Sequence, residues 1–444
     1  MKLSARIPPL AVVALTVVVA AFAALPARGQ TFHGRLTTSF YRYDRAPTDS
    51  TDHDYVRAHA LGIFHLEGLA DRRLSLHTYL NGQQDLATVN HDEFDYRVAN
   101  LYAQWKDRAE GYEIRGGRMR IFAGVANVAL DGGYGSYRFR DLATLEAFVG
   151  VQAPLTGAFK VADWDNSAYG GRLTFHTPAD LTTAVSFARQ NREPFTYDDP
   201  GEFTGRELQL PADQEELYGA NASWRFEPGS TVYGRVEWDR LQSRLKYAGG
   251  ALNMARPGER WSTDLEYFHR APSLYANSLL SVFDQGDIDE IGVRASYLVT
   301  HTVRAFGNVN LTYLNGDSGQ RFGVGAGQGP WSVSYTHRMG YTGDSDAVIG
   351  SYQREITEEA GIRAQIGYTS YELYADQDER NDSFVLGLGG ELRPLRTLAF
   401  DLEIQNLSQE LSTQPGFAGY EHDWRGHVRI TYWFFTGRGL TEVF

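Results

Sequence analysis

The sequence predicts an all-β fold, a single closed antiparallel transmembrane β-barrel with an even number of strands. Segments of about ten residues alternate apolar and polar side chains along most of the chain, and this length lets a tilted strand cross a bilayer. Short turns and longer polar connections follow these segments in strict alternation, as in outer-membrane barrels. Aromatic side chains gather toward the segment ends, where an interfacial girdle would lie.

The clearest of these segments is Glu421–Phe435, near the end of the chain. Every second residue from Trp424 to Phe434 is apolar or glycine, whereas Arg425, His427 and Arg429 share the other face. We expect this segment to be the closing strand, with its apolar face against lipid and its cationic face in the lumen. It should pair with the first strand, Thr31–Tyr43, and lie beside the acidic face of the preceding strand.

The first thirty residues predict export. Lys2 and Arg6 form a positive n-region, Leu10–Leu25 an apolar core, and Ala27–Gly29 a small-x-small cleavage site. We interpret residues 1–29 as a signal peptide, 30–435 as the barrel and 436–444 as a C-terminal tail ending in Phe444. An uncleaved N-terminal anchor is the alternative reading of the same flanks.

Composition excludes several classes of protein. Cysteine is absent, which removes disulfides, thiolate metal sites and covalently attached haem. The formal charge is −13, and removal of residues 1–29, which hold three Lys/Arg and no acid, makes it −16. A charge of this sign argues against nucleic acid as a partner. The 46 glycines and 26 tyrosines, with 42% hydrophobic residues, are typical of a barrel in which only one face of each strand is apolar.

The predicted turns and loops fix the number of strands. Short turns rich in Pro, Gly and charge are expected at Gly68–Arg73, Asp107–Gly111, Arg140–Ala143, Thr177–Asp180, Glu227–Ser230, Arg256–Arg260, Thr300–Thr302, Gly327–Pro330, Thr357–Glu359 and Arg393–Arg396. Longer polar loops are expected at Asp44–Asp54, Gln84–Asp95, Ala123–Leu130, Pro154–Asn166, Asn191–Gln214, Ala271–Asp287, Tyr341–Asp346, Tyr374–Asp382 and Gln409–Glu421, with short connections near Leu241 and at Asn315–Ser318. With both termini on the short-turn side, this count predicts 22 strands. Three glycine-rich segments are the least strand-like, and losing one or two hairpins would leave 18 or 20 strands: Gly133–Arg140, Lys246–Ala255 and Arg321–Gly327.

A secreted soluble sandwich, propeller or β-solenoid would also alternate. Arginines and carboxylates at strand centres argue against it, because a soluble core would hold aliphatic residues there. The placement of aromatic residues near strand ends argues for lipid interfaces: Trp105, Trp224, Trp238, Trp261, Trp331 and Tyr432. No repeat of propeller-blade length is present.

As a pattern over the mature chain, the sequence resembles bacterial outer-membrane β-barrels of the porin-like class, with no specific family indicated. Members of that class commonly end in an aromatic residue that assists assembly. This chain ends in Phe444, but Phe435 closes the last predicted strand, so either Phe444 or the Tyr432/Phe434 pair is the expected assembly signal. No segment resembling the plug domain of TonB-dependent receptors precedes the first strand. Gly117-Arg118 and Asp131-Gly132 resemble the Gly-Arg and Asp-Gly pairs of some substrate-specific export and uptake barrels.

Catalytic chemistry is not predicted. The twelve histidines are scattered, and neither Gly-x-Ser-x-Gly nor His-Glu-x-x-His is present. We therefore predict no catalytic residues, no cofactor and no metal site. An outer-membrane lipid-modifying enzyme remains the least favoured alternative.

Charged residues on the predicted inner faces are the strongest functional signal. The candidate selectivity residues are Arg57, Arg172, Arg235, Arg294, Arg304, Arg363, Arg425, Arg429, Glu237, Asp239, Asp264, Glu266, Asp401 and Glu403. Opposite charges could pair across strands and rigidify the wall, as Asp401 and Glu403 could with Arg425 and Arg429. They could also create a transverse field that selects small polar solutes. Within the longest loop, Phe195, Tyr197 and Phe203 are candidates for a constriction that folds inward.

The expected function is passive diffusion of small hydrophilic solutes through a charged lumen. A structural sleeve or scaffold around a multihaem cytochrome or in a polysaccharide export complex is the main alternative. Expected partners are outer-membrane lipid, lipopolysaccharide, small polar solutes and the barrel-assembly machinery. Homo-oligomerisation and a partner protein inside the lumen stay open.

Overall fold

The structure is a computed structural model that describes residues 30–45, 53–86, 95–107, 109, 111–153, 164–193, 195–198, 207–210, 213–271, 286–314, 316–340, 343–372, 380–410 and 420–436. The predicted signal peptide and the tail from residue 437 lie outside the described residues, so both remain predictions. No helix in the described part of the chain is long and apolar enough to cross a membrane.

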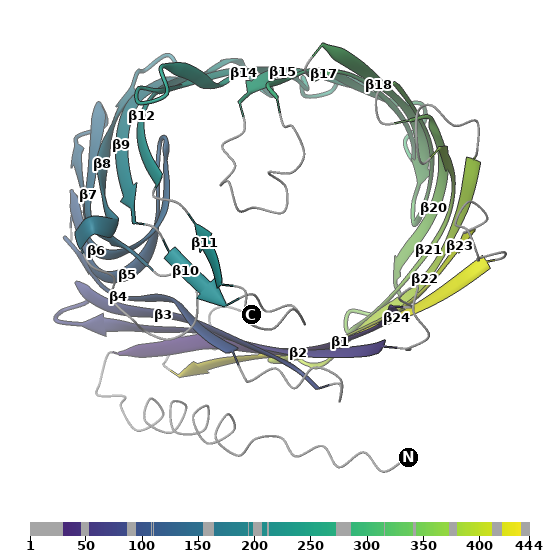
Figure 1. Cartoon of the computed structure of the whole chain (residues 1–444), viewed down its shortest axis with the longest axis horizontal. Coiled ribbons are helices and arrows are strands. Elements are labelled where there is room, and N and C mark those ends of the chain that lie inside the picture. Colours follow the sequence, from purple (N-terminus) through teal and green to yellow (C-terminus); the bar gives the residue numbers. More distant parts are fainter. Residues whose placement is uncertain are drawn as a thin grey trace.

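A single closed antiparallel sheet of 22 strands forms the molecule, as predicted. Each strand pairs with its neighbours in the chain, and β1 (Thr31–Arg45) also pairs with β24 (Tyr420–Thr436), which closes the ring. Viewed down its axis, the barrel surrounds a wide lumen (Figure 1). A separate two-stranded sheet, β10 (Phe195–Asp198) with β11 (Glu207–Leu210), falls inside the ring in this view.

The remaining strands of the wall follow in chain order: β2 (His53–Leu69), β3 (Leu74–Asp85), β4 (Asp95–Lys106), β5 (Tyr112–Ala123), β6 (Ala126–Phe139), β7 (Ala143–Gln152), β8 (Ser167–His176), β9 (Leu181–Arg192), β12 (Asp213–Glu227), β13 (Ser230–Asp239), β14 (Arg244–Met254), β15 (Trp261–Arg270), β16 (Ile288–Leu298), β17 (Val303–Leu314), β18 (Asp317–Gln328), β19 (Trp331–Gly340), β20 (Ser345–Glu355), β21 (Ala360–Glu372), β22 (Arg380–Leu395) and β23 (Leu398–Glu410). A short 3-10 helix, η1 (Trp164–Asn166), precedes β8.

All ten predicted short turns fall between consecutive strands, nine of them within about two residues at each end. The exception is Arg393–Arg396, because β22 continues to Leu395 and leaves only Arg396 and Thr397 in the turn. The three glycine-rich segments are strands as well, within β6, β14 and β18. The predicted loop Ala123–Leu130 is wrong: β5 runs to Ala123, a tight turn occupies Gly124 and Val125, and β6 begins at Ala126. Ala123–Leu130 is apolar, whereas the other predicted loops are polar, because most of its side chains are buried in an apolar cluster with residues of the wall.

The two faces of the wall differ as alternation predicts. One face carries large apolar side chains that are exposed in the isolated chain, such as Val149, Val185 and Leu388, each more than half exposed. This is the surface that lipid would cover. The predicted girdle residues lie near strand ends, with Trp261 and Trp331 as the first residues of β15 and β19.

The closing seam has its own apolar cluster on this outer face. Phe32 of β1 stacks near Phe434 of β24 with ring centroids 5.2 Å apart, and Phe64 of β2 lies 5.7 Å from Phe434. Gly34 makes room, since a Cβ there would meet the Phe434 ring at 2.6 Å. The predicted pairing of first and last strands is confirmed, from Phe32 opposite Thr436 to Tyr43 opposite Arg425.

The barrel lumen as candidate functional site

The most unusual element of the lumen is the β5–β6 hairpin. β5 pairs with β4 only through Glu113–Arg118, opposite Leu101–Lys106, although both strands have 12 residues. Beyond Arg118, β5 no longer pairs with β4 and remains paired only with β6. The two strands therefore leave the line of the wall at this point. We call Met119–Leu130, the part beyond this point, the folded-in hairpin.

The bend is built from the Gly-Arg and Asp-Gly pairs that stood out in the sequence. Gly117 has a φ of +128°, and a side chain there would collide with the Leu101 carbonyl oxygen of β4. Gly117 lies opposite Gly132, and Arg118 opposite Asp131. Both pairs are therefore parts of one bend.

A buried ion pair holds the bend. Arg118 is 3% exposed, and its Nε and Nη2 donate to the two carboxylate oxygens of Asp131 at 2.6 and 2.7 Å. Arg118 Nη1 also donates to the Val98 carbonyl oxygen of β4 at 3.4 Å. The guanidinium thus satisfies a carbonyl on the stretch of β4 that β5 leaves without a partner strand.

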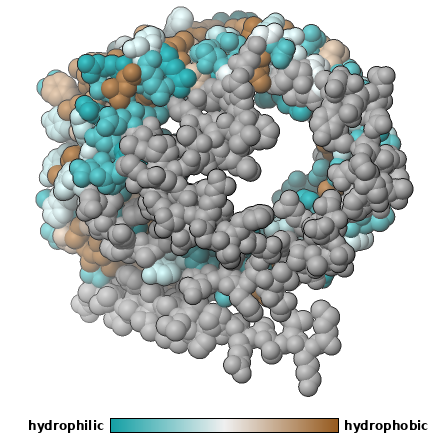
Figure 2. Space-filling view, in the orientation of Figure 1, coloured by the Kyte–Doolittle hydropathy of each residue, from teal (hydrophilic) through white to brown (hydrophobic). Residues whose placement is uncertain are grey.

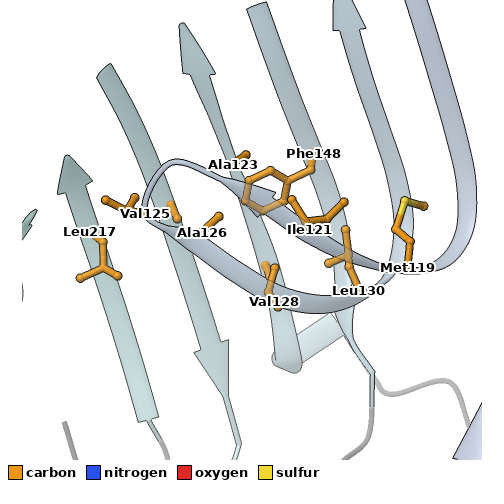
Figure 3. Packing of buried hydrophobic residues seen from close by; sticks show 11 residues of the cluster. Met119, Ile121, Ala123, Val125, Ala126, Val128, Leu130, Phe148 and Leu217 are labelled. Atoms are coloured by element: carbon orange, nitrogen blue, oxygen red, sulfur yellow. The ribbon is translucent and has the colours of Figure 1, made fainter. Parts of the chain in front are cut away.

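One face of the folded-in hairpin packs on the inner wall (Figure 3). Met119, Ile121 and Leu130 are each at most 1% exposed. The cluster that they form with the wall residues Phe148, Ala168, Ala188 and Leu217 spans β7, β8, β9 and β12 and also includes Ala123, Val125, Ala126 and Val128. Small wall residues let the hairpin lie close. Each large apolar side chain buried here stabilises docking by about 2 kcal/mol, because a water-filled lumen makes burial favourable.

This packing identifies the inner face of the wall. On β8, Ala168 belongs to the cluster and Arg172 lies near the hairpin turn, whereas Tyr169 and Phe175, at the other alternation, are exposed toward lipid. Arg172 lies on the same face of β8 as Ala168, which packs against the folded-in hairpin. Its Nη1 lies 3.9 Å from Glu146 of β7, on the same face.

Polar contacts fix the tip of the hairpin. The Val125 N–H donates to Ser186 Oγ of β9 at 3.1 Å, and Arg235 Nη2 of β13 donates to the Gly124 carbonyl oxygen at 3.2 Å. Gly124 has a φ of +63°, and a side chain there would collide with Ser186. Arg235, predicted from sequence as a lumen cation, thus anchors the hairpin while pairing with Glu237.

The opposite face of the folded-in hairpin is exposed. Phe122 is 67% exposed, and the Arg120 guanidinium lies 5.2 Å from its ring centroid. Arg120 Nε also donates to Asn127 Oδ1 at 3.0 Å. A cation, an aromatic ring and an amide are therefore presented to the lumen by an element that narrows it from one side.

A charged network occupies the wall near the closing seam. Arg363 of β21 donates to both oxygens of Asp401, at 2.8 and 3.1 Å, and to Glu403 Oε2 at 2.8 Å. It reaches these β23 residues by crossing Gly389 of β22, where a Cβ would lie 2.7 Å from Arg363 Nε. Of the two expected partners, Arg429 is more distant from Asp401, at 3.7 Å, and Arg425 pairs with Asp423 instead. His427 Nδ1 lies 3.8 Å from Asp401.

A row of rings and charges crosses the wall in the half near the short turns. His65 Nδ1 lies 2.6 Å from His77 Nδ1, His33 stacks on His65 at 5.0 Å, and His77 stacks on Tyr102 at 4.8 Å. Arg115 continues the row between Tyr102 and Tyr134, whose hydroxyl donates to Glu146. The row was not predicted, because no short motif reveals that these residues share a register.

The other candidate selectivity residues have varied surroundings. Arg304 donates to Ser296 at 3.1 Å, Asp264 accepts from Asn253 and lies opposite Arg294, and Arg57 lies opposite Asp85. Glu266 lies opposite Ala251. Asp239 is fully buried, and its Oδ1 accepts from the Leu241 and Gln242 N–H groups, so this carboxylate caps the β13–β14 turn. In the same turn, hydrogen bonding to Glu216 raises the pKa of Arg240.

Phe195 and Tyr197, two of the candidate constriction residues, belong to β10, and their side chains are outside the described part of the structure. Phe203 lies outside the described residues altogether. Down the barrel axis, an opening remains visible in the space-filling view, and hydrophilic residues cover much of the upper left rim (Figure 2).

Metal chemistry finds no support among the side chains that the structure describes, where no three His, Asp or Glu residues are grouped to hold an ion. His33, His65 and His77 are not grouped to hold an ion either; they contact one another and Tyr102.

No protein-family profile matches the sequence, and no curated protein is similar to it. Solved structures do match. The translocation pore of the P pilus usher PapC has a TM-score of 0.54 at 9% identity, covering 91% of this chain and 99% of the other. A mutant ferric enterobactin receptor of Pseudomonas aeruginosa, PfeA, has a TM-score of 0.52 at 10% identity, covering 90% of this chain and 81% of the other. OpdQ of the same organism has a TM-score of 0.43 at 7% identity, covering 92% and 98%.

The closed antiparallel ring, its apolar outer face and the likeness to the two structures with TM-scores above 0.5 define the fold class. The chain is a β-barrel of the outer-membrane type. It resembles the usher pore and the receptor barrel in fold, and the identities of 9% and 10% extend the likeness no further.

Proposed function

We propose that the protein is a passive channel of the bacterial outer membrane for small hydrophilic solutes. The observation that supports this most strongly is a wide lumen with polar walls that the folded-in hairpin narrows only on the side of β7, β8, β9 and β12. Water and small solutes would pass beside Arg120 and Phe122 on one side and the Arg363 network on the other.

Several features of the wall support a channel rather than a filled sleeve. The Asp401 and Arg118 charges are engaged by partners within this chain, so neither needs a second protein for neutralisation. The lumen-facing side chain of Phe122 is largely exposed. The solved structures with TM-scores above 0.5 include the translocation pore of a pilus usher and a ferric enterobactin receptor.

The proposal is tested by swelling of liposomes that contain the purified barrel. We expect neutral sugars to enter at rates that fall steeply with their size. Deletion of Phe195–Leu208, which removes β10, its connection to β11 and the first two residues of β11, should speed entry of the larger sugars, because we propose that this segment constricts the mouth. No swelling with any sugar would contradict the channel, and unchanged rates in the deletion variant would contradict the constriction.

A further inference from the structure

Three arginines gather on the inner wall at a distance from the sites described above. Arg270 of β15, Arg321 of β18 and Arg338 of β19 line one pocket of about 340 Å³, together with Glu290 and Asn310. They lie toward the strand ends away from the short turns, so the pocket is near the mouth. Its size is in the range of small-ligand sites.

The register of β18 and β19 places two of these charges directly opposite each other. Arg321 pairs with Arg338 in the antiparallel ladder. Like charges at directly opposite positions destabilise a sheet, and most cross-strand charge pairs are of opposite sign. An arrangement of this kind is favourable when an anion lies between the two guanidiniums.

The chain supplies no such anion among its described residues. None of the three arginines has an ion pair with a described carboxylate within 4.0 Å, although the chain as a whole is acidic. Glu290, the one acid among the described residues that line the pocket, accepts a hydrogen bond from Asn310 Nδ2 at 2.6 Å. Gly319, which has no side chain, also lines the pocket.

We infer that this pocket binds the oxyanion group of a small solute, a phosphate or a carboxylate, on its way through the lumen. The planar guanidinium fork matches both groups with two parallel hydrogen bonds. The pocket would therefore concentrate anionic solutes at the mouth of a barrel whose net charge repels them. The role in transport rests on the proposed channel function, whereas the binding site itself does not.

The test is titration calorimetry of the folded, detergent-solubilised barrel with inorganic phosphate. We expect Arg321→Gln/Arg338→Gln to weaken phosphate binding at least tenfold. Arg321→Lys/Arg338→Lys, which keeps the charge and loses the fork, should have intermediate affinity. The matched control Arg256→Gln/Arg393→Gln removes the same charge from exposed positions in and beside two short turns, where each arginine pairs with a glutamate, and should bind as the wild type does.

The unfolding temperature is a second measurement, and in the absence of phosphate it tests the like-charge repulsion alone. In low-salt buffer without phosphate, the Gln double variant should unfold at a temperature no lower than the wild type, since like-charge repulsion is removed. Phosphate should raise the unfolding temperature of the wild type and leave that of the Gln double variant unchanged. Absence of phosphate binding by the wild type, or equal affinity in the Gln variant, would overturn the site. A barrel that binds phosphate and conducts no ions would keep the site and refute the channel.

Discussion

At the scale of single residues, the lumen depends on glycines that make room for arginines. Arg363 reaches Asp401 and Glu403 only because Gly389 has no side chain. Gly387 lies on the same face of the same strand, but a Cβ there would make ordinary contacts, the nearest at 3.6 Å with Gln405. The two glycines therefore form a natural comparison.

Gly389→Ala should displace the Arg363 guanidinium and weaken the network with Asp401 and Glu403. We expect a loss of about 1–2 kcal/mol, of the order of a charged hydrogen bond, and a shift of ion selectivity toward cations as two carboxylates become less neutralised. Gly387→Ala should change neither. Unfolding midpoints and reversal potentials measure the two effects, and equal behaviour of the two variants would refute this account of Gly389.

The Arg118–Asp131 ion pair is the second residue-level feature that shapes the lumen, because it holds the bend of the folded-in hairpin. Asp131→Ala leaves a buried guanidinium without its carboxylate, a change that typically destabilises by about 3 kcal/mol or more. Amide hydrogen exchange over Met119–Leu130 should accelerate about a hundredfold as the folded-in hairpin undocks. Arg120→Ala, on the exposed face of the same hairpin, should leave exchange unchanged. Equal exchange in both variants would show that the ion pair does not hold the bend.

At the scale of elements, the strands were predictable and the folded-in hairpin was not. Alternation fixes which face of a strand meets lipid, so Tyr169 and Arg172 could be placed on opposite faces without a structure. The apolar run Ala-Gly-Val-Ala-Asn-Val-Ala-Leu at Ala123–Leu130 was the available signal of an inward element, because a solvated loop would be polar. Its docking site could not be predicted, since Phe148, Ala168, Ala188 and Leu217 are brought together only by the register of β7, β8, β9 and β12.

The candidate site was predictable to a similar degree. Cross-strand neighbours such as Asp401 and Arg429 followed from the strand order. The preference of Asp401 for Arg363, two strands away, did not, because it depends on the space above Gly389. Arg321 was missed because its strand, β18, is rich in glycine and alternates weakly. Arg338 lies on the polar face of a strand that alternates clearly, and only the register of β18 and β19 brings it opposite Arg321.

Docking of the folded-in hairpin as an element can be tested at its turn. Gly124→Ala forces a side chain into a left-handed conformation, which destabilises by about 1 kcal/mol, and also into Ser186. Gly329, with a φ of +56° and nothing within 4 Å of an added Cβ, is the matched control. Hydrogen exchange over Met119–Leu130 should rise in Gly124→Ala and stay unchanged in Gly329→Ala. Slow exchange in both variants would mean that contact with Ser186 does not matter for docking.

At the scale of the whole molecule, a ring of 22 strands encloses more space than a selective pore needs. The β5–β6 hairpin reduces this space from within: its buried apolar face packs on the wall, and its exposed face borders the lumen. The folded-in hairpin is mechanically stiff, because β5 and β6 run into it from the wall and stay hydrogen-bonded to each other up to its turn. We therefore expect a steady open channel rather than one that fluctuates between closed and open states.

The central claim is that the lumen conducts and that the folded-in hairpin limits conduction. Single-channel recording in planar bilayers tests it, comparing the wild type with a variant in which Asn-Gly replaces Met119–Leu130 and joins Arg118 to Asp131 by a two-residue turn. We predict steady ohmic conductance for the wild type and a larger conductance for the variant. A wild-type barrel that conducts no ions, or a variant whose conductance is unchanged, would contradict the account.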